Sequence, residues 1–327
     1  VIAPGEIAML IILNDVVKNL RCCRKVNYAT HWVDPNGSDT TAIWGVFDFK
    51  SKTIGDAISK IPAFGARCQI ILMNSGDTEY NEKNFYNPLG SELNLKLTQG
   101  ALIDYFDSVD GGLFDTSANG ANGSIDVRVS GEKPNATPEY PNIIMEGGGA
   151  SGTNNIVRLD NTAWFSGMNL NMLQLSDADA LYIDHANAIL ELSECFIDMQ
   201  TIGTAFNVIK LINGTIKLRD CVISNTASTD SVIDMSGGKL ILNNCSIVNN
   251  INNASAHGIS ASGGKIVFIG TNRIITTHAS ANSLYTAGAI NVKKIGQLYT
   301  THVDSGGFTD LITGAGLVID ATDADVE

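Results

Sequence analysis

The sequence predicts an all-β protein folded as a parallel β-helix, and three observations lead to this fold class. Glycine contributes 32 of the 327 residues and proline only 7, a balance that favours many tight turns between short strands. Apolar residues make up 44% and charged residues only 17%, which argues against a disordered chain. From residue 157 onward, short segments of alternating apolar and polar residues recur about every 25 residues.

Residues 1–30 are predicted to form an N-terminal amphipathic helix that serves as an attachment segment. After Pro4 and Gly5, apolar residues recur with helical spacing, and two basic residues, Lys18 and Arg21, lie near the end of the stretch. The apolar positions are Ile7, Leu10, Ile11, Ile12, Val16, Val17 and Leu20. One such helix ahead of a β domain is more often a docking or oligomer contact than a catalytic element.

Residues 31–327 are predicted to form the β-helix domain, with loop-rich early coils at 31–155 and regular coils at 156–320. A strand at Trp32 leads into the Asn-Gly turn at 36–37, and a short helix over 53–61 is expected to be capped by Ser51 or Thr53. Further strands are expected over 68–73, 125–129 and 142–145.

The repeat that begins at residue 157 supplies three columns of stacked segments. The first column begins at Val157, Ile183, Ile209, Ile233, Ile259 and Ile290, and the second covers 189–192, 215–218, 239–242 and 265–268. The third begins at Cys195, Cys221 and Cys245. A repeat this short cannot bury its apolar face alone and must stack on its neighbours. Leucine-rich repeats share the period, but their leucine consensus is missing, so one coil of a parallel β-helix per repeat is predicted, with coils of about 24–26 residues.

Charge and composition exclude several classes of function. The net charge of −13 has the wrong sign for a protein that tracks nucleic-acid phosphates, so no nucleic-acid partner is expected. No run of about 18 apolar residues occurs, so no membrane insertion is expected. The six cysteines form no C-x-x-C pair and have no histidine at zinc-ligand spacing, so neither a metal nor a cofactor is expected.

With these columns in place, the chain over roughly 30–320 resembles the pectate-lyase-like superfamily of single-stranded right-handed parallel β-helices. The resemblance is carried by VDPNGSD at 33–39, TIGDAI at 53–58 and IILMNSGDTEY at 70–80. In that superfamily a short helix caps the first coil, and a strand, a small turn, a Gly and a Tyr begin the ladder. The resemblance implies the fold but no single activity, because the superfamily holds lyases, hydrolases, esterases, epimerases and non-catalytic adhesins.

The leading segment 2–20 is similar to the short helices that attach bacteriophage fibres and spikes to the virion. Six cysteines without a disulfide pattern fit a protein made in a reducing cytosol. These likenesses imply a bacteriophage virion structural protein of the tail fibre or spike type, an adhesin made in the host cytoplasm. Its expected partners are other virion proteins, bound through the N-terminal helix, a host surface polysaccharide, and two further copies in a homotrimer.

Two other functions remain open at this point. One is a polysaccharide depolymerase, a glycoside hydrolase or lyase, with paired carboxylates on the coils. The other is a capsid decoration protein that binds no host receptor. The motifs expected of polygalacturonases, pectate lyases and pectin esterases cannot be picked out of the sequence, so an enzyme is the less favoured hypothesis.

Four charged residues beside the first column are candidate ligand-binding residues, namely Arg158, Asp184, Lys210 and Asp234. On stacked coils their charges would alternate in sign along one line. The functional interpretation is a stripe that binds glycan. We favour the structural interpretation, a surface ladder of ion pairs that contribute about 0.2–1 kcal/mol each.

Glu194 and Asp220 are the candidate catalytic pair of the depolymerase hypothesis. They fall in one column at the corner before the cysteine strand, so they are expected about 5 Å apart. Glycoside hydrolysis needs two carboxylates about 5–9 Å apart, and a nearby like charge raises the pKa of one of them. The acids around them are Asp177, Asp179, Asp184, Glu191 and Asp198. Acidic residues at solenoid corners are more often simply solvated.

Two further residue types are expected to point inward. His185 is predicted to lie beside Leu159, Leu211 and Met235 as a neutral, hydrogen-bonded side chain and not as a metal ligand. The cysteines that begin the third column are predicted to stack as an interior ladder of thiols, which pack as small apolar residues.

Overall fold

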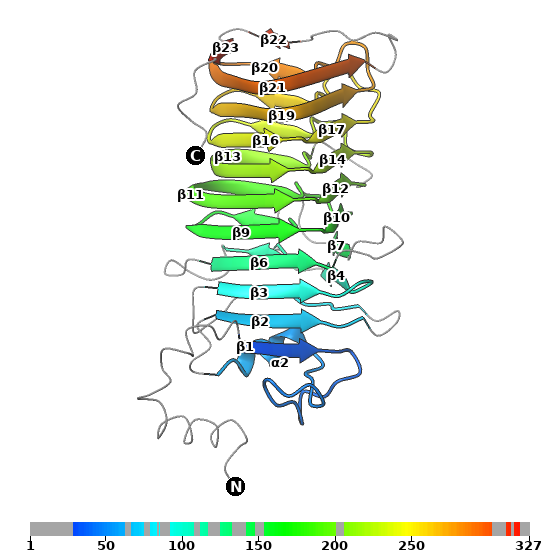
Figure 1. Ribbon diagram of the computed structural model, residues 1–327. Helices are drawn as coiled ribbons and strands as arrows, with labels where there is room; N and C mark the ends of the chain where they lie inside the picture. Colours follow the sequence, from blue (N-terminus) through cyan, green and yellow to red (C-terminus); the bar gives the residue numbers. More distant parts are fainter. Residues whose placement is uncertain are drawn as a thin grey trace, which may run out of the picture.

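The structure is a computed structural model that describes residues 29–62, 67–74, 79–83, 85, 92–107, 112–116, 125–132, 142–147, 154–200, 206–302, 312–314 and 317–320. These residues form a parallel β-solenoid, in which the 23 strands belong to one sheet (Figure 1). The prediction of an all-β chain folded into a parallel β-helix is thereby confirmed. The predicted helix within residues 1–30 lies outside the described residues. Within the described residues, no helix has the length and apolar character needed to cross a membrane.

The strands stack in three ladders, which we call face A, face B and face C. Face A, at the front of Figure 1, contains β1 (Ala29–Val33), β2 (Arg67–Leu72), β3 (Glu92–Leu97), β6 (Ile125–Gly131), β9 (Ala163–Met168), the second halves of β11 (Leu181–Ser193) and β13 (Ile209–Arg219), β16 (Lys239–Asn243), the first halves of β19 (Lys265–Thr276) and β21 (Ile290–His302), and β23 (Leu317–Asp320).

Face B contains β4 (Leu102–Asp107), β7 (Asn142–Gly147), β10 (Asn171–Gln174), β12 (Phe196–Met199), β14 (Val222–Asn225), β17 (Ser246–Asn249) and the second halves of β19 and β21. Face C contains β5 (Phe114–Asp115), β8 (Val157–Leu159), the first halves of β11 and β13, β15 (Ile233–Met235), β18 (Ile259–Ala261), β20 (Leu284–Thr286) and β22 (Ile312–Gly314).

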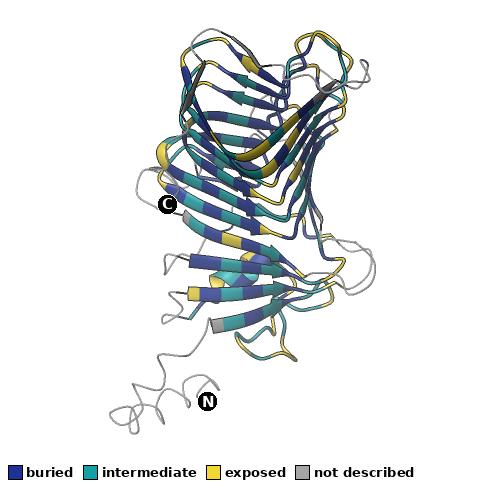
Figure 2. Cartoon of the chain, turned by 45° about the horizontal axis from the view of Figure 1, so that its top comes forward, coloured by how far each residue is buried: buried dark blue, intermediate teal, exposed yellow. Residues whose placement is uncertain are grey.

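The core runs along the inside of the solenoid because side chains on each strand alternate between inward and outward positions. Successive coils of face A contribute fully buried inward residues, among them Leu190, Ile216, Leu240 and Ile266. The alternation is visible in Figure 2 as dark blue and teal bands along the strands. One continuous apolar cluster extends from Val33 to Val292.

The first predicted column is confirmed for four of its members and wrong for two. Backbone pairing on face C aligns Val157, Ile209, Ile233 and Ile259. Between the first two lies Leu181, whereas Ile183 is two residues further along the strand and pairs with Leu211. Ile290 belongs to face A, and Leu284 pairs with Ile259 instead. Because a shift of two residues keeps every apolar side chain inward, the pattern alone cannot separate the two registers.

The second and third predicted columns are confirmed. Segments 189–192, 215–218, 239–242 and 265–268 pair in register on face A. Cys195, Cys221 and Cys245 are buried at the corner between faces A and B. The Cys221 thiol lies 3.5 Å from the backbone oxygen of Leu192, and the Cys245 thiol 3.3 Å from that of Leu218. The Cys221 thiol and burial together raise the pKa of Cys195 and Cys245, so these two thiols are neutral and pack as apolar groups.

The end of the solenoid at β1 is closed by the loop 34–51 and by α2 (Ile54–Ser59). The sequence predicts this short helix, over 53–61. Thr53 is the N-cap residue, and its hydroxyl accepts a hydrogen bond from the backbone N–H of Asp56 at 3.1 Å. The carboxylate of Glu82 accepts the backbone N–H groups of Ile54 and Gly55, each at 2.6 Å. The first turn of α2 is therefore satisfied by side chains from two segments.

A buried chain of hydrogen bonds ties β1 to α2. His31 Nδ1 accepts the backbone N–H of Gly45 at 3.3 Å, so its Nε2 carries the proton and donates to Ser51 Oγ at 2.8 Å. Ser51 Oγ donates to Asp56 Oδ2 at 2.6 Å, and Lys60 Nζ donates to the same oxygen at 2.7 Å. Burial lowers the pKa of His31 from 6.5 to about 4, so the imidazole is neutral near pH 7.

We expect the free energy of unfolding to fall as the pH is lowered from 6.5 towards 4. Because His31 has a lower pKa in the folded chain than in the unfolded chain, only the unfolded chain takes up its proton in this window. The gap between 6.5 and about 4 corresponds to a loss of at most about 3 kcal/mol. Urea denaturation near pH 7 and near pH 4.5 measures it. His31→Gln should flatten the pH dependence. A parallel pH dependence in wild type and His31→Gln would contradict the assignment.

Candidate functional site: a polar groove on face A

The outward side of face A presents columns of side chains along the solenoid axis, because its strands pair in register. One column contains Arg128, Ser166, Glu191, Lys217, Ile241 and Val267. The column beside it contains Ser130, Met168, Ser193, Arg219, Asn243 and Ile269. Neighbouring members of a column are about 4.8 Å apart, the spacing of paired strands.

A groove of about 360 Å³ lies over the middle of these two columns. Its walls come from β9, β11, β13, β16 and β19, so it runs across five successive coils. The lining residues are Ser166, Glu191, Leu192, Ser193, Lys217, Leu218, Arg219, Ile241, Asn243 and Ile269. Its volume is near the lower end of the range of small-molecule sites, about 300–1,000 Å³.

Each charged residue that lines the groove is in an ion pair, one inside the groove and one with a residue outside it. Lys217 Nζ lies 2.9 Å from Glu191 Oε1, and the two side chains are 43% and 35% exposed. Arg219 Nε lies 3.7 Å from Asp220 Oδ2 at the edge of face A. Paired charges beside hydroxyl, amide and aliphatic groups suit a ligand that offers many hydroxyl groups together with apolar C–H surfaces. A polysaccharide has this chemistry.

Glu194 and Asp220, the predicted catalytic pair, stack at the corner that follows face A. The backbone N–H of Glu194 donates to the carbonyl of Arg219 at 2.9 Å, so the two residues are on adjacent coils, as predicted. Both have a left-handed backbone with φ of +53°, a conformation shared by Asn169 and Asn244 at the same corner. Asp220 Oδ1 accepts from Asn244 Nδ2 at 3.2 Å. Glu194 and Asp220 therefore have a structural role in forming the corner, and their catalytic role remains a prediction.

Three of the four predicted ligand-binding residues lie on one line of face C, and the placement of Asp184 is wrong. Tyr182 pairs with both Arg158 and Lys210, while Asp184 is two residues further along and its Oδ1 accepts from an amide on the next coil. The Arg158 guanidinium lies 4.9 Å from the centre of the Tyr182 ring, and Lys210 Nζ lies 3.8 Å from Asp234 Oδ2. The charges therefore do not alternate as expected. Binding by these residues remains a prediction.

The predicted inward position of His185 is also wrong, for the same reason. Ile183 occupies the inward place beside Leu159 and Leu211. His185 lies half-buried two residues later, and its Nδ1 accepts the backbone N–H of Asn187 at 3.2 Å. The strand β11 bends here between faces C and A, with an irregular register after Ile183.

Two of the other predicted acids, Asp179 and Asp198, contribute to the packing of corners, whereas Asp177 is exposed. Asp179 is buried and accepts the backbone N–H of Asn207 at 2.8 Å, while burial raises its pKa. Asp198 Oδ2 accepts from Gln200 Nε2 at 2.8 Å. In the part of the chain that the structure describes, no three His, Cys, Asp or Glu side chains gather as they would around a metal ion.

The groove contains residues that the sequence argument did not single out. Of its lining residues, Glu191 is a member of the predicted acidic group. Leu192 and Leu218 are inward core residues at the floor of the groove. The signal that identifies the others is their outward position on face A, where residues two apart recur on successive coils.

No protein-family model, no curated protein and no solved structure matches this chain. The features that support a function are therefore the groove and the side chains that line it.

Proposed function

We propose that the protein is a polysaccharide-binding adhesin whose groove on face A holds a glycan chain along the solenoid axis. The groove, which presents hydroxyl, amide, carboxylate and cationic groups on four coils and an aliphatic side chain on a fifth, is the observation that carries this proposal. Strand spacing is about 4.8 Å, close to the length of one sugar ring, so similar contacts can recur along a polymer. Many individually weak contacts then give useful affinity.

We also propose, from the resemblance in sequence, that this adhesin is a structural component of a bacteriophage virion, a tail fibre or spike. It would attach to other virion proteins through residues 1–30 and assemble as a homotrimer made in the host cytoplasm. Light scattering of the purified chain tests the oligomer: we expect about three times the chain mass of 34.7 kDa. A monomer at micromolar concentration would contradict the trimer.

Ser193→Trp is expected to abolish retention of the protein on immobilised bacterial capsular and lipopolysaccharide glycans. Ser193 is an outward, half-buried residue that lines the groove, so an indole at this position would fill it. We expect a loss of at least about tenfold in affinity, or about 1.4 kcal/mol. The matched control is Ser130→Trp, because Ser130 is half-buried in the same column but outside the groove. Its affinity should stay within about twofold of wild type.

The same glycan panel separates the adhesin from the two alternatives. A depolymerase would release new reducing ends, or produce ultraviolet absorbance from unsaturated uronic acids. If such a signal appears and is lost in Glu194→Gln or Asp220→Asn, the depolymerase hypothesis is supported over the adhesin. Equal loss of retention in the two tryptophan variants would place the glycan contact outside the groove. If the panel retains no protein at all, a capsid decoration protein becomes the better hypothesis.

A further inference from the structure

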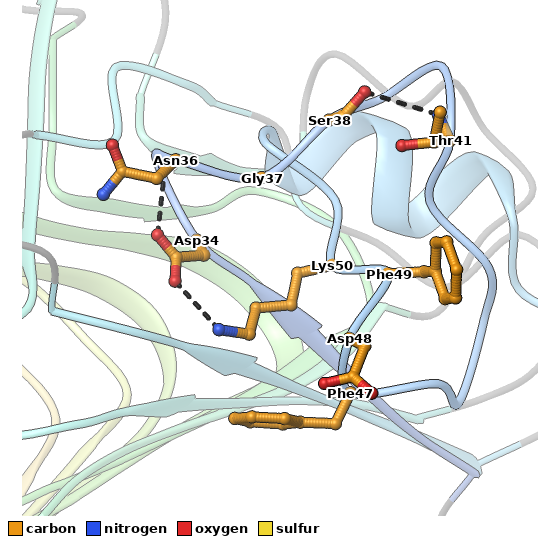
Figure 3. A pocket seen from close by; sticks show the side chains of 9 residues that line it. All are labelled: Asp34, Asn36, Gly37, Ser38, Thr41, Phe47, Asp48, Phe49 and Lys50. Atoms are coloured by element: carbon orange, nitrogen blue, oxygen red, sulfur yellow. Dashed lines mark hydrogen bonds and ion pairs between the residues drawn. The ribbon is translucent and has the colours of Figure 1, made fainter.

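A second hollow lies in the loop 34–51, at the end of the solenoid that is closed by α2. It has a volume of about 330 Å³, and Figure 3 shows the nine residues that line it. The hollow is formed by the turn at 34–38 and by Thr41 on one side, and by the segment 47–50 on the other. None of these residues belongs to the groove on face A.

The walls of this hollow are fixed by hydrogen bonds of the loop. The backbone N–H of Gly37 donates to Asp34 O at 2.7 Å, and that of Ser38 donates to Lys50 O at 3.1 Å. A Cβ added at Gly37 would collide with the backbone oxygen of Ser51, so the two sides of the loop are packed against each other there. A site that is already formed loses little conformational entropy when a ligand binds.

Two phenylalanine rings in the hollow are unusually exposed for large apolar side chains. Phe47 is 49% exposed and Phe49 is 44% exposed. The Phe47 ring is held in place, because Lys50 Nζ lies 4.4 Å from its centre and the ring of Trp32 meets it edge-on at 5.3 Å. In Figure 3 Phe47 lies beneath the Lys50 side chain, and Phe49 turns to the other side. Aromatic rings fixed in this way offer an apolar surface to the C–H groups of a ligand.

Some charged and polar side chains of the hollow already have partners within the protein, and others are open to a ligand. Asp34 Oδ2 and Lys50 Nζ form an ion pair at 3.1 Å and largely neutralise each other. The carboxylate of Asp48 and the side-chain amide of Asn36 are exposed, and neither makes a hydrogen bond within the described part of the chain. The carboxylate on one side of the hollow can accept hydrogen bonds from a hydroxyl group, and the amide on the other side can accept or donate them (Figure 3).

We propose that this hollow is a second binding site, specific for one neutral sugar residue. Asp48 and Asn36 bind hydroxyl groups on opposite sides of the sugar, and Phe47 packs against its C–H face. The ligand is neutral because the remaining charge of the site is that of Asp48, which repels carboxylated or phosphorylated sugars. The site is separate from the groove on face A and does not depend on its function.

Titration of the full chain with glucose, galactose, mannose and N-acetylglucosamine tests this site. Tryptophan fluorescence serves as the readout because Trp32 contacts Phe47, and saturation-transfer NMR provides a second one. We expect saturable binding of at least one of these sugars with a Kd in the millimolar range. Phe47→Ala and Asp48→Asn should each weaken it at least about tenfold. Circular dichroism checks folding, and Asp48→Asn, at an exposed position, should leave the fold intact.

Two matched variants decide where the sugar binds. Tyr299→Ala removes an aromatic ring that is 41% exposed and lies on β21, towards the opposite end of the solenoid, and it should leave sugar binding unchanged. Ser193→Trp blocks the groove and should also leave it unchanged. If none of the four sugars shows saturable binding, or if binding survives in both Phe47→Ala and Asp48→Asn, the proposal is overturned. Loss of sugar binding in Ser193→Trp alone would likewise overturn it.

Discussion

Gly264→Ala is expected to lower the free energy of unfolding by about 3 kcal/mol or more. Gly264 lies at the corner between faces C and A with φ of +90°, where a residue with a Cβ is strained. The added methyl group would also lie 2.7 Å from backbone atoms of Gly237 and Gly238 on the preceding coil. That coil cannot move away freely, because the backbone N–H of Lys265 donates to Gly238 O at 2.9 Å. Urea denaturation followed by circular dichroism measures the loss.

Gly45→Ala provides a control that separates strain from collision. Gly45 has φ of +80°, but the nearest atom to an added Cβ is 3.8 Å away. Gly45→Ala should therefore lower the free energy of unfolding only by the cost of a left-handed backbone at alanine, about 1–2 kcal/mol. If the two variants lose the same stability, close packing between coils at Gly264 is not the reason for its effect.

Asn225→Leu is the second substitution with a large expected effect, a loss of about 3 kcal/mol. Asn225 is fully buried at the end of β14, and its Nδ2 donates to Ser228 O at 2.8 Å and to Asp230 O at 3.0 Å. Its Oδ1 accepts the backbone N–H of Ser228 at 2.9 Å and that of Ala227 at 3.3 Å. Leucine has the same number of side-chain heavy atoms and the same branching but leaves several of these backbone groups without a partner in the interior.

Asn250→Leu is the control for this substitution. Asn250 follows the equivalent strand of the next coil, but its side chain is exposed. We expect a change within about 0.5 kcal/mol, as is usual for surface positions. A similar loss in both variants would show that leucine is unfavourable at these corners for a reason other than the buried amide.

The interior amides explain how the long turns between faces B and C stay attached to the solenoid. Asn249 occupies the same column as Asn225 one coil later, and its Nδ2 donates to Asp230 O and His257 O, both at 3.0 Å. Gln174, in the same column two coils before Asn225, donates to Asn154 O at 2.7 Å. Buried turn carbonyls thus find donors inside the solenoid, where no water is needed to satisfy them.

Much of the fold could be predicted from the sequence because its signals are local or strictly periodic. The alternation of period two assigns Leu190 and Leu192 to the core, and the spacing of Cys195, Cys221 and Cys245 brings them into one interior ladder. The cap at Thr53 is likewise a local signal, since its hydroxyl meets a backbone N–H three residues later. These features need no knowledge of distant contacts.

Register and site were decided by the tertiary structure. A shift of two residues leaves the pattern of β11 unchanged, so only the pairing of coils shows that Leu181, not Ile183, follows Val157, and that Tyr182 replaces Asp184 between Arg158 and Lys210. The groove is likewise invisible in any single repeat, because residues about 25 positions apart form its walls. By itself, the sequence determined for most strands which side chains point inward, whereas the residues that stack on one another were decided by corner lengths and inter-coil hydrogen bonds. A surface site on a solenoid consists of residues that stack on successive coils, and so only the folded chain defines it.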